Sequence, residues 1–473
     1  MKILIKNLGP IHEFAFDLDK DLHLVYGKNS IGKSHAIAAV YLIFKNILKA
    51  KQHPEFLHST DEDVEKLSEF TNKEFEGSLL LNPLAEEILI EELSFFLQLL
   101  VNSFHNSFSN LENLKNRRNI EQSTISMDFK NLFIQMKFSE NKIWQVEELQ
   151  IKKNFSLQLA TYNNTKIDKS GNHIYKSEKK KPGLSFFRDV RDCLALSFNE
   201  VSDKISDIYF LPASRSGLYV GMSATAPLLT EFSQLRYSLP NMTFNIPTFS
   251  EPMSDYFLQL TSIKVNGKVD VFNQIAHKME QGILKGAVVF NGDKKRLEYQ
   301  EHGLNVNLLV TETSSMISEI APIVAFLKYI LKQEKEIELR HSKKVTSIFS
   351  ETAQNILFIE EPEAHLHPSV QVEMMRLFIE LANNGVKIVM TTHSDFMFNE
   401  LTNLILADKI KPKQVASIHL VMTEKGSVDK GDMQATADGI DDFNFSEVTE
   451  QLYEERMRLI DLKNETADAI QEN

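Results

Sequence analysis

One short segment limits the fold more than any other: a glycine-rich loop between an apolar strand and an amphipathic helix. The loop reads Gly27, Lys28, Asn29, Ser30, Ile31, Gly32, Lys33 and Ser34, and His35 follows it. Residues 23–26 form a short apolar run, and apolar residues recur at helical spacing over 37–48. The two glycines permit backbone turns that a side chain would block, and the amide groups at a helix start attract anions. The pattern predicts a phosphate-binding loop (P-loop) in an α/β fold.

The P-loop pattern assigns a role to each of its polar side chains. Lys33 is expected to reach the β- and γ-phosphates, and the Ser34 hydroxyl is expected to bind Mg²⁺. We include His35 among the nucleotide-binding residues because it directly follows the loop. ATP and Mg²⁺ are therefore the expected ligands. The alternative is a plain glycine turn with an exposed lysine, which needs no ligand.

A second motif is an apolar strand that ends in two acids. Residues 356–359 are apolar, and Glu360 and Glu361 follow them. In nucleotide hydrolases one such carboxylate holds the metal and a neighbour polarises the attacking water. We assign Glu360 to the metal and Glu361 to the water. An acidic pair alone is often a surface feature, but together with a P-loop it predicts ATP hydrolysis.

Three histidines lie close to these acids in the sequence. His393 follows the apolar run 386–390 and precedes a helical pattern, so it is expected at the ligand-binding edge of the sheet, within reach of a γ-phosphate. His365 and His367 could instead join Glu360 and Glu361 in a metal cluster, which would make the chain a metal-dependent nuclease. Their spacing matches no standard zinc pattern. We expect the loop that contains them to help pair two subunits.

The order of strand and helix patterns predicts the architecture. From residue 355 to 422 strands alternate with helices, which indicates a mainly parallel sheet. Residues 124–162 alternate apolar and polar side chains, which predicts antiparallel strands, whereas residues 163–183 look like a loop. The fold class is therefore α/β, a mixed, mainly parallel sheet with helical and antiparallel β insertions. Four segments are expected: 1–54, the start of the ATPase head; 55–204, an inserted region; 205–310, a head lobe with an irregular insertion; and 311–473, the rest of the head.

Composition excludes several classes of protein. The net charge of −13 argues against a protein that coats nucleic acid indiscriminately, although residues 150–183 carry eight lysines against two acids. No apolar stretch is long enough to span a bilayer, no signal peptide is evident, and there is one cysteine, Cys193. We expect a protein of the reducing bacterial cytoplasm that has no membrane partner.

The order of these motifs resembles a known family. The P-loop, Glu-Glu-Pro-Glu at 360–363, His-Leu-His-Pro at 365–368 and Thr-His-Ser at 392–394 resemble the ABC ATPases of the overcoming-lysogenisation-defect (OLD) family. Its relatives include the ATPase subunits of the anti-phage systems PARIS, Septu and Gabija. Residues 5–11 and 211–217 are similar to the same group. The resemblance implies a P-loop ATPase head of the ABC type.

The resemblance also implies a shared nucleotide site. Ser314 and Ser315 match the signature element, which in such families contacts the γ-phosphate bound by the other subunit of a homodimer or higher oligomer. Two departures stand out: Glu360 replaces the aspartate of many relatives, and Met316 replaces a glycine. Arg215 is the nearest polar candidate for the missing glutamine loop.

The function that the resemblance implies is an ATP-driven switch in phage defence. Only 80 residues follow His393, which leaves no room for the nuclease domain of many OLD-like proteins. The effector is therefore expected to be a separate protein, a nuclease, and the trigger to be DNA or a phage protein. The alternative is a RecF-like DNA-repair ATPase that clamps DNA across its dimer. The net charge argues against it, and the lysine stretch argues for it.

Overall fold

The computed structural model describes most of the chain, and every structural statement below concerns those residues. They are 1–52, 78–108, 114–119, 121–138, 143–159, 163–177, 185–219, 221, 249–265, 270–304, 306–331, 353–441 and 446–471. Lys179, Lys180 and Lys181, and the charged run 332–344, lie outside them.

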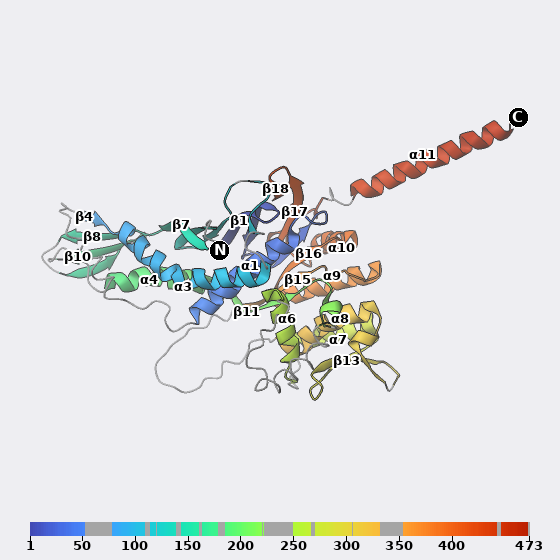
Figure 1. The fold of residues 1–473 in the computed structure, drawn as a ribbon, viewed down its shortest axis with the longest axis horizontal. Helices are drawn as coiled ribbons and strands as arrows, with labels where there is room; N and C mark the ends of the chain where they lie inside the picture. Colours follow the sequence, from blue (N-terminus) through green and yellow to red (C-terminus); the bar gives the residue numbers. More distant parts are fainter. Residues whose placement is uncertain are drawn as a thin grey trace, which may run out of the picture.

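A parallel half-sheet forms the centre of the molecule (Figure 1). Its strands run in the order β11 (Ile205–Leu211), β15 (Gln354–Glu360), β16 (Val386–Thr392), β3 (Leu22–Tyr26) and β17 (Val415–Thr423). All four neighbouring pairs are parallel. The strands are apolar runs buried on both faces, as parallel strands covered by helices must be. One strand, β16, separates the P-loop strand β3 from the acidic strand β15.

The same sheet continues into an antiparallel half. Beyond β17 the order is β18 (Gly426–Asp429), β2 (Ile11–Asp17), β1 (Lys2–Leu8), β5 (Thr124–Asp128), β6 (Leu132–Phe138) and β7 (Trp144–Ile151). The change of direction occurs at β18, which is antiparallel to β17 and parallel to β2. Of the antiparallel strands expected within residues 124–162, β5, β6 and β7 therefore extend the central sheet.

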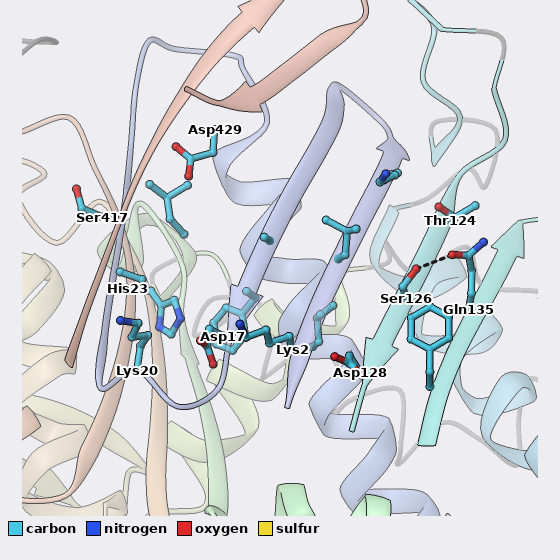
Figure 2. A pocket seen from close by; sticks show the side chains of 18 of the residues that line it. Lys2, Asp17, Lys20, His23, Thr124, Ser126, Asp128, Gln135, Ser417 and Asp429 are labelled. Atoms are coloured by element: carbon cyan, nitrogen blue, oxygen red, sulfur yellow. Dashed lines mark hydrogen bonds between the residues drawn. The ribbon is translucent and has the colours of Figure 1, made fainter. Parts of the chain in front are cut away.

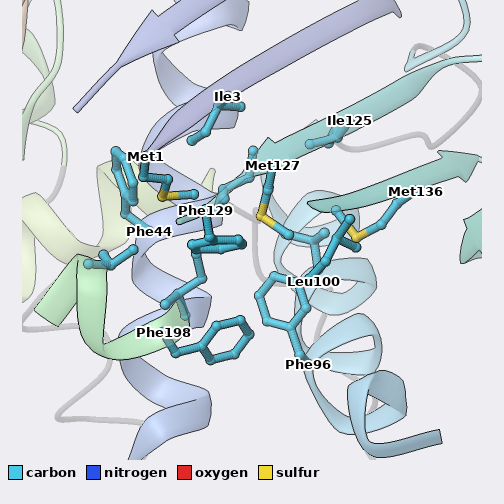
Figure 3. Close-up of a cluster of buried hydrophobic side chains, with 14 of the residues drawn as sticks. Met1, Ile3, Phe44, Phe96, Leu100, Ile125, Met127, Phe129, Met136 and Phe198 are labelled. Carbon is cyan, nitrogen blue, oxygen red and sulfur yellow. The ribbon is translucent and has the colours of Figure 1, made fainter. Parts of the chain in front are cut away.

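One face of this sheet is covered by the helices α1 (Lys33–Lys51), α3 (Asn82–Phe108) and α4 (Ser185–Ser202). Figure 3 shows side chains of the strands, such as Ile3 and Met127, meeting Phe96 and Phe198 of two of these helices. Alternate residues of β1 and β5 point to this core, as the period of a half-buried strand requires. The core fixes α1, and with it the start of the P-loop helix.

The other face carries a second core. It lies against α9 (Pro368–Asn383) and α10 (Asp395–Leu406), and it extends to α6 (Glu251–Thr261), α7 (Val271–Met279) and α8 (Ser315–Ala325). A three-stranded sheet of β12 (Gly286–Asn291), β13 (Arg296–Glu301) and β14 (Asn307–Leu309) packs against α8. After α8 the chain continues directly into a π-helical turn, η4 (Phe326–Ile330).

The expectation of a loop at residues 163–183 is wrong over the described part, residues 163–177. Residues there form β9 (Asn164–Ile167) and β10 (His173–Ser177), in a small sheet with β4 (Ser78–Leu80) and β8 (Phe155–Leu159). The Asp168 carboxylate accepts bonds from the amides of Ser170 and Asn172 and so closes the turn between them. All four β9 side chains are exposed, so the strand has no apolar alternation that the sequence could show.

A C-terminal helix, α11 (Ser446–Gln471), projects from the rest of the chain (Figure 1). Its described side chains, residues 450–463, are all exposed. Within the described chain, no helix combines the length and apolarity that crossing a membrane requires.

Candidate nucleotide site

The P-loop joins the end of β3 to the start of α1 through a strained backbone. Gly27, Ser30 and Gly32 have φ angles of 136°, 61° and 100°. A Cβ on Gly27 would lie 2.3 Å from the Leu420 carbonyl oxygen, and one on Gly32 would lie 2.6 Å from the Pro10 ring. Both glycines are therefore required by close packing as well as by backbone conformation.

A buried serine supports the loop from the neighbouring strand. The Ser427 side chain, on β18, donates to the carbonyl oxygens of Ile31 and Pro10 and is wholly buried. Nothing in the sequence marks Ser427, which is 396 residues from Ile31. It fixes the loop against the N-terminal hairpin.

Lys33 is the first charged group of the site. Its side chain is only 6% exposed, and its Nζ donates to the carbonyl oxygens of Gly27 (3.0 Å) and Lys28 (2.9 Å). Burial lowers the pKa of Lys33 to about 8, while the charges of Glu361 and Glu363 act in the opposite direction. The alternative of an exposed lysine on a plain turn does not fit this geometry.

Glu360 and Ser34 meet at the end of β15. The buried Glu360 carboxylate bonds to the Ser34 hydroxyl and accepts from the Ala213 amide at 3.1 Å. Burial raises the pKa of Glu360, which a bound cation would reverse. A carboxylate and a hydroxyl at a P-loop are oxygen donors of the kind that Mg²⁺ prefers, so these residues fit the ion.

Glu361 faces His393 across the edge of the sheet. The Glu361 Oε1 lies 3.7 Å from His393 Nε2, and the Glu361 side chain is 41% exposed. Its φ of 42° leaves the strand conformation, and its amide donates to the Thr391 carbonyl at 3.0 Å. Burial, and then the charge of Lys33, lower the pKa of His393, so the ring is neutral near pH 7.

A third acid, Glu363, holds the histidine loop. Its Oε1 accepts from the His393 amide at 2.6 Å, and a bond to the Thr392 side chain accompanies it. Burial raises the pKa of Glu363. Glu363 is the last acid of the Glu-Glu-Pro-Glu motif, but its sequence position alone does not indicate this role.

Arg215 lies beneath the two acids. Its guanidinium donates to the carbonyl oxygens of Glu360 (2.8 Å), Glu361 (3.3 Å) and Pro212 (3.1 Å), and it pairs with Glu319. The side chain is completely buried. As the candidate for the glutamine loop, Arg215 is thus placed to hold the backbone of the acids.

The remaining predicted residues are Ser314 and Ser315, at the start of α8, and His35, beside α3. Ser314 caps α8 by accepting from the Ile317 amide at 3.4 Å, Ser315 begins the helix, and both serines are exposed. No hydrogen bond within the described chain joins them to the P-loop. His35 packs beside Phe108 of α3, with ring centroids 5.3 Å apart.

The two histidines of the His-Leu-His-Pro motif have local roles. His367 caps α9, where its Nδ1 accepts from the Ser369 amide at 3.3 Å. His365 has a φ of 60° in the turn before it. Among residues the structure describes, no three His, Cys, Asp or Glu side chains are arranged to hold a metal ion.

A separate hollow of about 860 Å³ lies over the antiparallel half of the sheet (Figure 2). It is lined by His23 at the start of β3, so it lies away from the P-loop at the other end of that strand. Its charged groups nearly balance, with the lysines 2, 6, 20 and 152 against the aspartates 17, 128 and 429. Burial lowers the pKa of His23 to about 3, so this ring adds no charge. The hollow is not a strongly basic surface.

Comparisons with known proteins identify the family of the chain. The family model described as an AAA ATPase domain matches residues 1–398. Among solved structures, an SMC head bound to the C-winged helix domain of ScpA is 10% identical with a TM-score of 0.36, and 91% of this chain and 97% of that chain are covered.

Two further SMC heads give similar values. The head domain from Thermotoga maritima is 9% identical with a TM-score of 0.32, covering 90% of this chain and 96% of that one. The Pyrococcus furiosus head with an extended coiled coil, bound to the C-terminal domain of ScpA, is 10% identical with a TM-score of 0.35, covering 96% and 98%. No curated protein matches the chain. With its P-loop, its mixed sheet and a match over residues 1–398, the chain belongs to the AAA ATPase domain family and has the α/β fold of a P-loop ATPase.

Proposed function

We propose that the chain is a Mg²⁺-dependent ATPase whose subunits complete each other's ATP sites in a homodimer or higher oligomer. One observation supports this most strongly. Lys33, Ser34, Glu360, Glu361 and His393 meet at one edge of the sheet. A second anion site, at the exposed start of α8, is not bonded to them within the described chain. A helix start with free amides and a serine cap binds anions well.

The residues divide the chemistry between them. The P-loop amides and Lys33 bind the phosphates of ATP. Ser34 and Glu360 would hold Mg²⁺, which neutralises phosphate charge when bound. Glu361 accepts a proton from the attacking water, and neutral His393 can hydrogen-bond to a γ-phosphate oxygen. Ser314 and Ser315 of the partner subunit close the site.

We further propose that the ATPase is the switch of an anti-phage defence complex. ATP binding closes the dimer, and hydrolysis opens it again. This conformational cycle controls a separate effector protein, a nuclease, when DNA or a phage protein acts as trigger. The order of motifs that resembles the OLD family supports this part of the proposal.

The second candidate is a RecF-like ATPase that clamps DNA. The observation in its favour is that Lys166 and Lys169, from the lysine-rich stretch, are exposed. The near-balanced charge of the hollow in Figure 2 gives it no further support. Binding of duplex DNA that weakens steeply between 50 and 200 mM salt, as counterion release requires, would favour this candidate.

The composite site is tested by Glu361→Gln, which keeps the shape of the side chain and removes its basicity. Hydrolysis is expected to fall about 10²- to 10⁴-fold while ATP binding is kept, so that ATP and Mg²⁺ trap a dimer. Light scattering after size exclusion measures the mass. Glu373→Gln, at an exposed acid on α9, is the matched control and is expected to hydrolyse ATP normally.

A second variant separates the two halves of the site. Adding Ser315→Arg to the Glu361→Gln chain is expected to keep ATP binding and abolish the dimer, because the bulky charge blocks the signature end. A Glu361→Gln chain that binds ATP with Mg²⁺ and remains monomeric at micromolar concentration would contradict the composite site.

A further inference from the structure

The most deeply buried ion pair near the site joins Arg215 to Glu319. The side chains are 0% and 1% exposed, and Nη2 lies 3.3 Å from Oε2. Removing two charges from water is costly, and apolar residues often serve stability equally well at such places. Stability alone therefore does not explain the pair. The contacts of Arg215 and of Glu319 indicate what else it does.

The Arg215 end holds the backbone of the two hydrolytic acids. The guanidinium donates to the main-chain oxygens of both Glu360 and Glu361. Ser214 and Glu361, with φ angles of 52° and 42°, are both in the left-handed region. A backbone with such angles is held by its surroundings. Here the planar fork of one arginine supplies that support, because it bonds to two successive carbonyls.

The Glu319 end belongs to the signature helix. Glu319 lies four residues after Ser315 on α8, so one helical turn connects it to the exposed anion site. The Glu319 carbonyl accepts from Arg215 Nε at 3.3 Å, and its Oε1 accepts from the Ser216 hydroxyl at 2.5 Å. A movement of α8 thus acts directly on Arg215 and its neighbour.

The contact between the two charges is sensitive to position. The Glu319 Oε2 lies close to the Arg215 guanidinium, but the two groups are not aligned for a hydrogen bond. Within the described chain this oxygen has no hydrogen-bond partner. A buried carboxylate oxygen in this state gains free energy from better alignment. A small displacement of α8 therefore changes the strength of the pair.

We propose that Arg215 and Glu319 form a joint that couples the two ATP sites of the dimer, with Arg215 as a positioning residue for hydrolysis. The inference rests on the composite site proposed above. The γ-phosphate of ATP bound in the partner's P-loop attracts the N-terminus of α8 and displaces the helix. Glu319 passes this displacement to Arg215, and Arg215 shifts the carbonyls of Glu360 and Glu361 in its own subunit. Each site thereby registers whether the other is filled.

The test compares Glu319→Gln with the unaltered chain. Glutamine keeps the size of the side chain and removes its charge. The coupling predicts that the unaltered chain hydrolyses ATP with a Hill coefficient above 1. In Glu319→Gln the coefficient falls to 1 and kcat falls about tenfold, within the usual range of coupling energies. Binding of a fluorescent ATP analogue to the monomer stays within about twofold.

Arg215→Lys removes the other end of the joint. Lysine keeps a charge beside Glu319, but one ammonium lacks the fork that bonds two carbonyls. The variant is expected to lower kcat about tenfold with little change in KM, because the acids lose position while the P-loop is intact. The double variant is expected to cost no more than the worse single variant, since the two residues act as one unit.

A matched control separates this role from general stability. Arg191 and Glu92 form another largely buried ion pair, 2.7 Å apart, between α4 and α3. Glu92→Gln removes a carboxylate charge from a buried ion pair, as Glu319→Gln does. Glu92 is distant in sequence from Glu360 and Glu361. The Glu92→Gln variant is expected to lower the melting temperature as Glu319→Gln does, and to leave kcat and the Hill coefficient unchanged.

The outcomes distinguish failure of the Arg215–Glu319 joint from failure of the composite ATP site on which it rests. If Glu361→Gln forms an ATP-bound dimer, but Glu319→Gln keeps both kcat and cooperativity, the joint is wrong and the composite site stands. Independent, additive effects of the two single variants also overturn the joint, as does a Hill coefficient of 1 in the unaltered chain. If no ATP-bound dimer forms at all, the composite site itself has failed.

Discussion

At the scale of single residues, the surroundings of Lys33 set how the site responds to pH. Burial lowers its pKa to about 8, against an ordinary value of 10.5. The chain without nucleotide therefore loses the ammonium charge above pH 8. Binding of the triphosphate favours the charged form, so a proton must be taken up with ATP in that range.

The ATP affinity is therefore expected to fall as the pH rises. ATP affinity is expected to fall by only about twofold between pH 7 and 8, and then by about tenfold per pH unit well above pH 8, where each binding event costs one protonation. Fluorescence titration of the Glu361→Gln chain from pH 7 to 9.5 measures it without hydrolysis. An affinity that stays flat to pH 9.5 would show that Lys33 keeps its ordinary pKa.

At the scale of elements, the P-loop depends on packing against the strand beside it. The Leu420 carbonyl of β17 lies where a side chain on Gly27 would be, and a backbone oxygen cannot move aside cheaply. The conformation of the loop therefore depends on the alignment of β3 with β17 as much as on the loop's own sequence.

Gly27→Ala tests this dependence. The substitution is expected to destabilise the chain by about 1–3 kcal/mol and to abolish ATP binding, because the loop must leave β17. Gly431→Ala is the control: Gly431 also has a positive φ, 69°, but no atom lies within 4 Å of its added Cβ. It adds backbone strain alone, so ATP binding is expected to persist. Thermal unfolding and nucleotide titration give both readouts. Equal loss of binding in the two variants would rule out packing as the cause.

At the scale of the whole molecule, α11 stands apart from both hydrophobic cores. Its described side chains, including Leu452, Tyr453 and Met457, are exposed, and none belongs to either core. Burial of apolar area is the main source of stability, so this part of the helix adds little to the head.

Truncation after residue 441 tests that separation. The shortened chain is expected to melt within about 2 °C of the full one and to bind ATP equally well, because its cores are intact. Differential scanning calorimetry at low protein concentration provides the measurement. A fall of several degrees would mean that α11 packs on the head. Ser107→Ala, at a polar contact between α3 and α6, serves as a small-effect reference.

The sequence by itself determined the P-loop, the acidic strand end and the strand–helix alternation around them. These features depend on local chemistry: glycines where φ is positive, apolar runs for buried strands, and polar residues where strands end. Elsewhere, β9 escaped prediction, because a fully exposed strand shows no alternation of apolar and polar side chains.

Only the tertiary structure decided which side chains support that chemistry. Ser427 meets the P-loop, Glu363 holds His393, and Arg215 bonds to the backbone of Glu360 across 145 residues of sequence. No local pattern specifies such contacts, because they exist only once β15, β16 and β18 lie beside their neighbours. Burial then sets the charge states, since the low pKa of Lys33 and the raised pKa of Glu360 follow from exclusion of water by the assembled sheet.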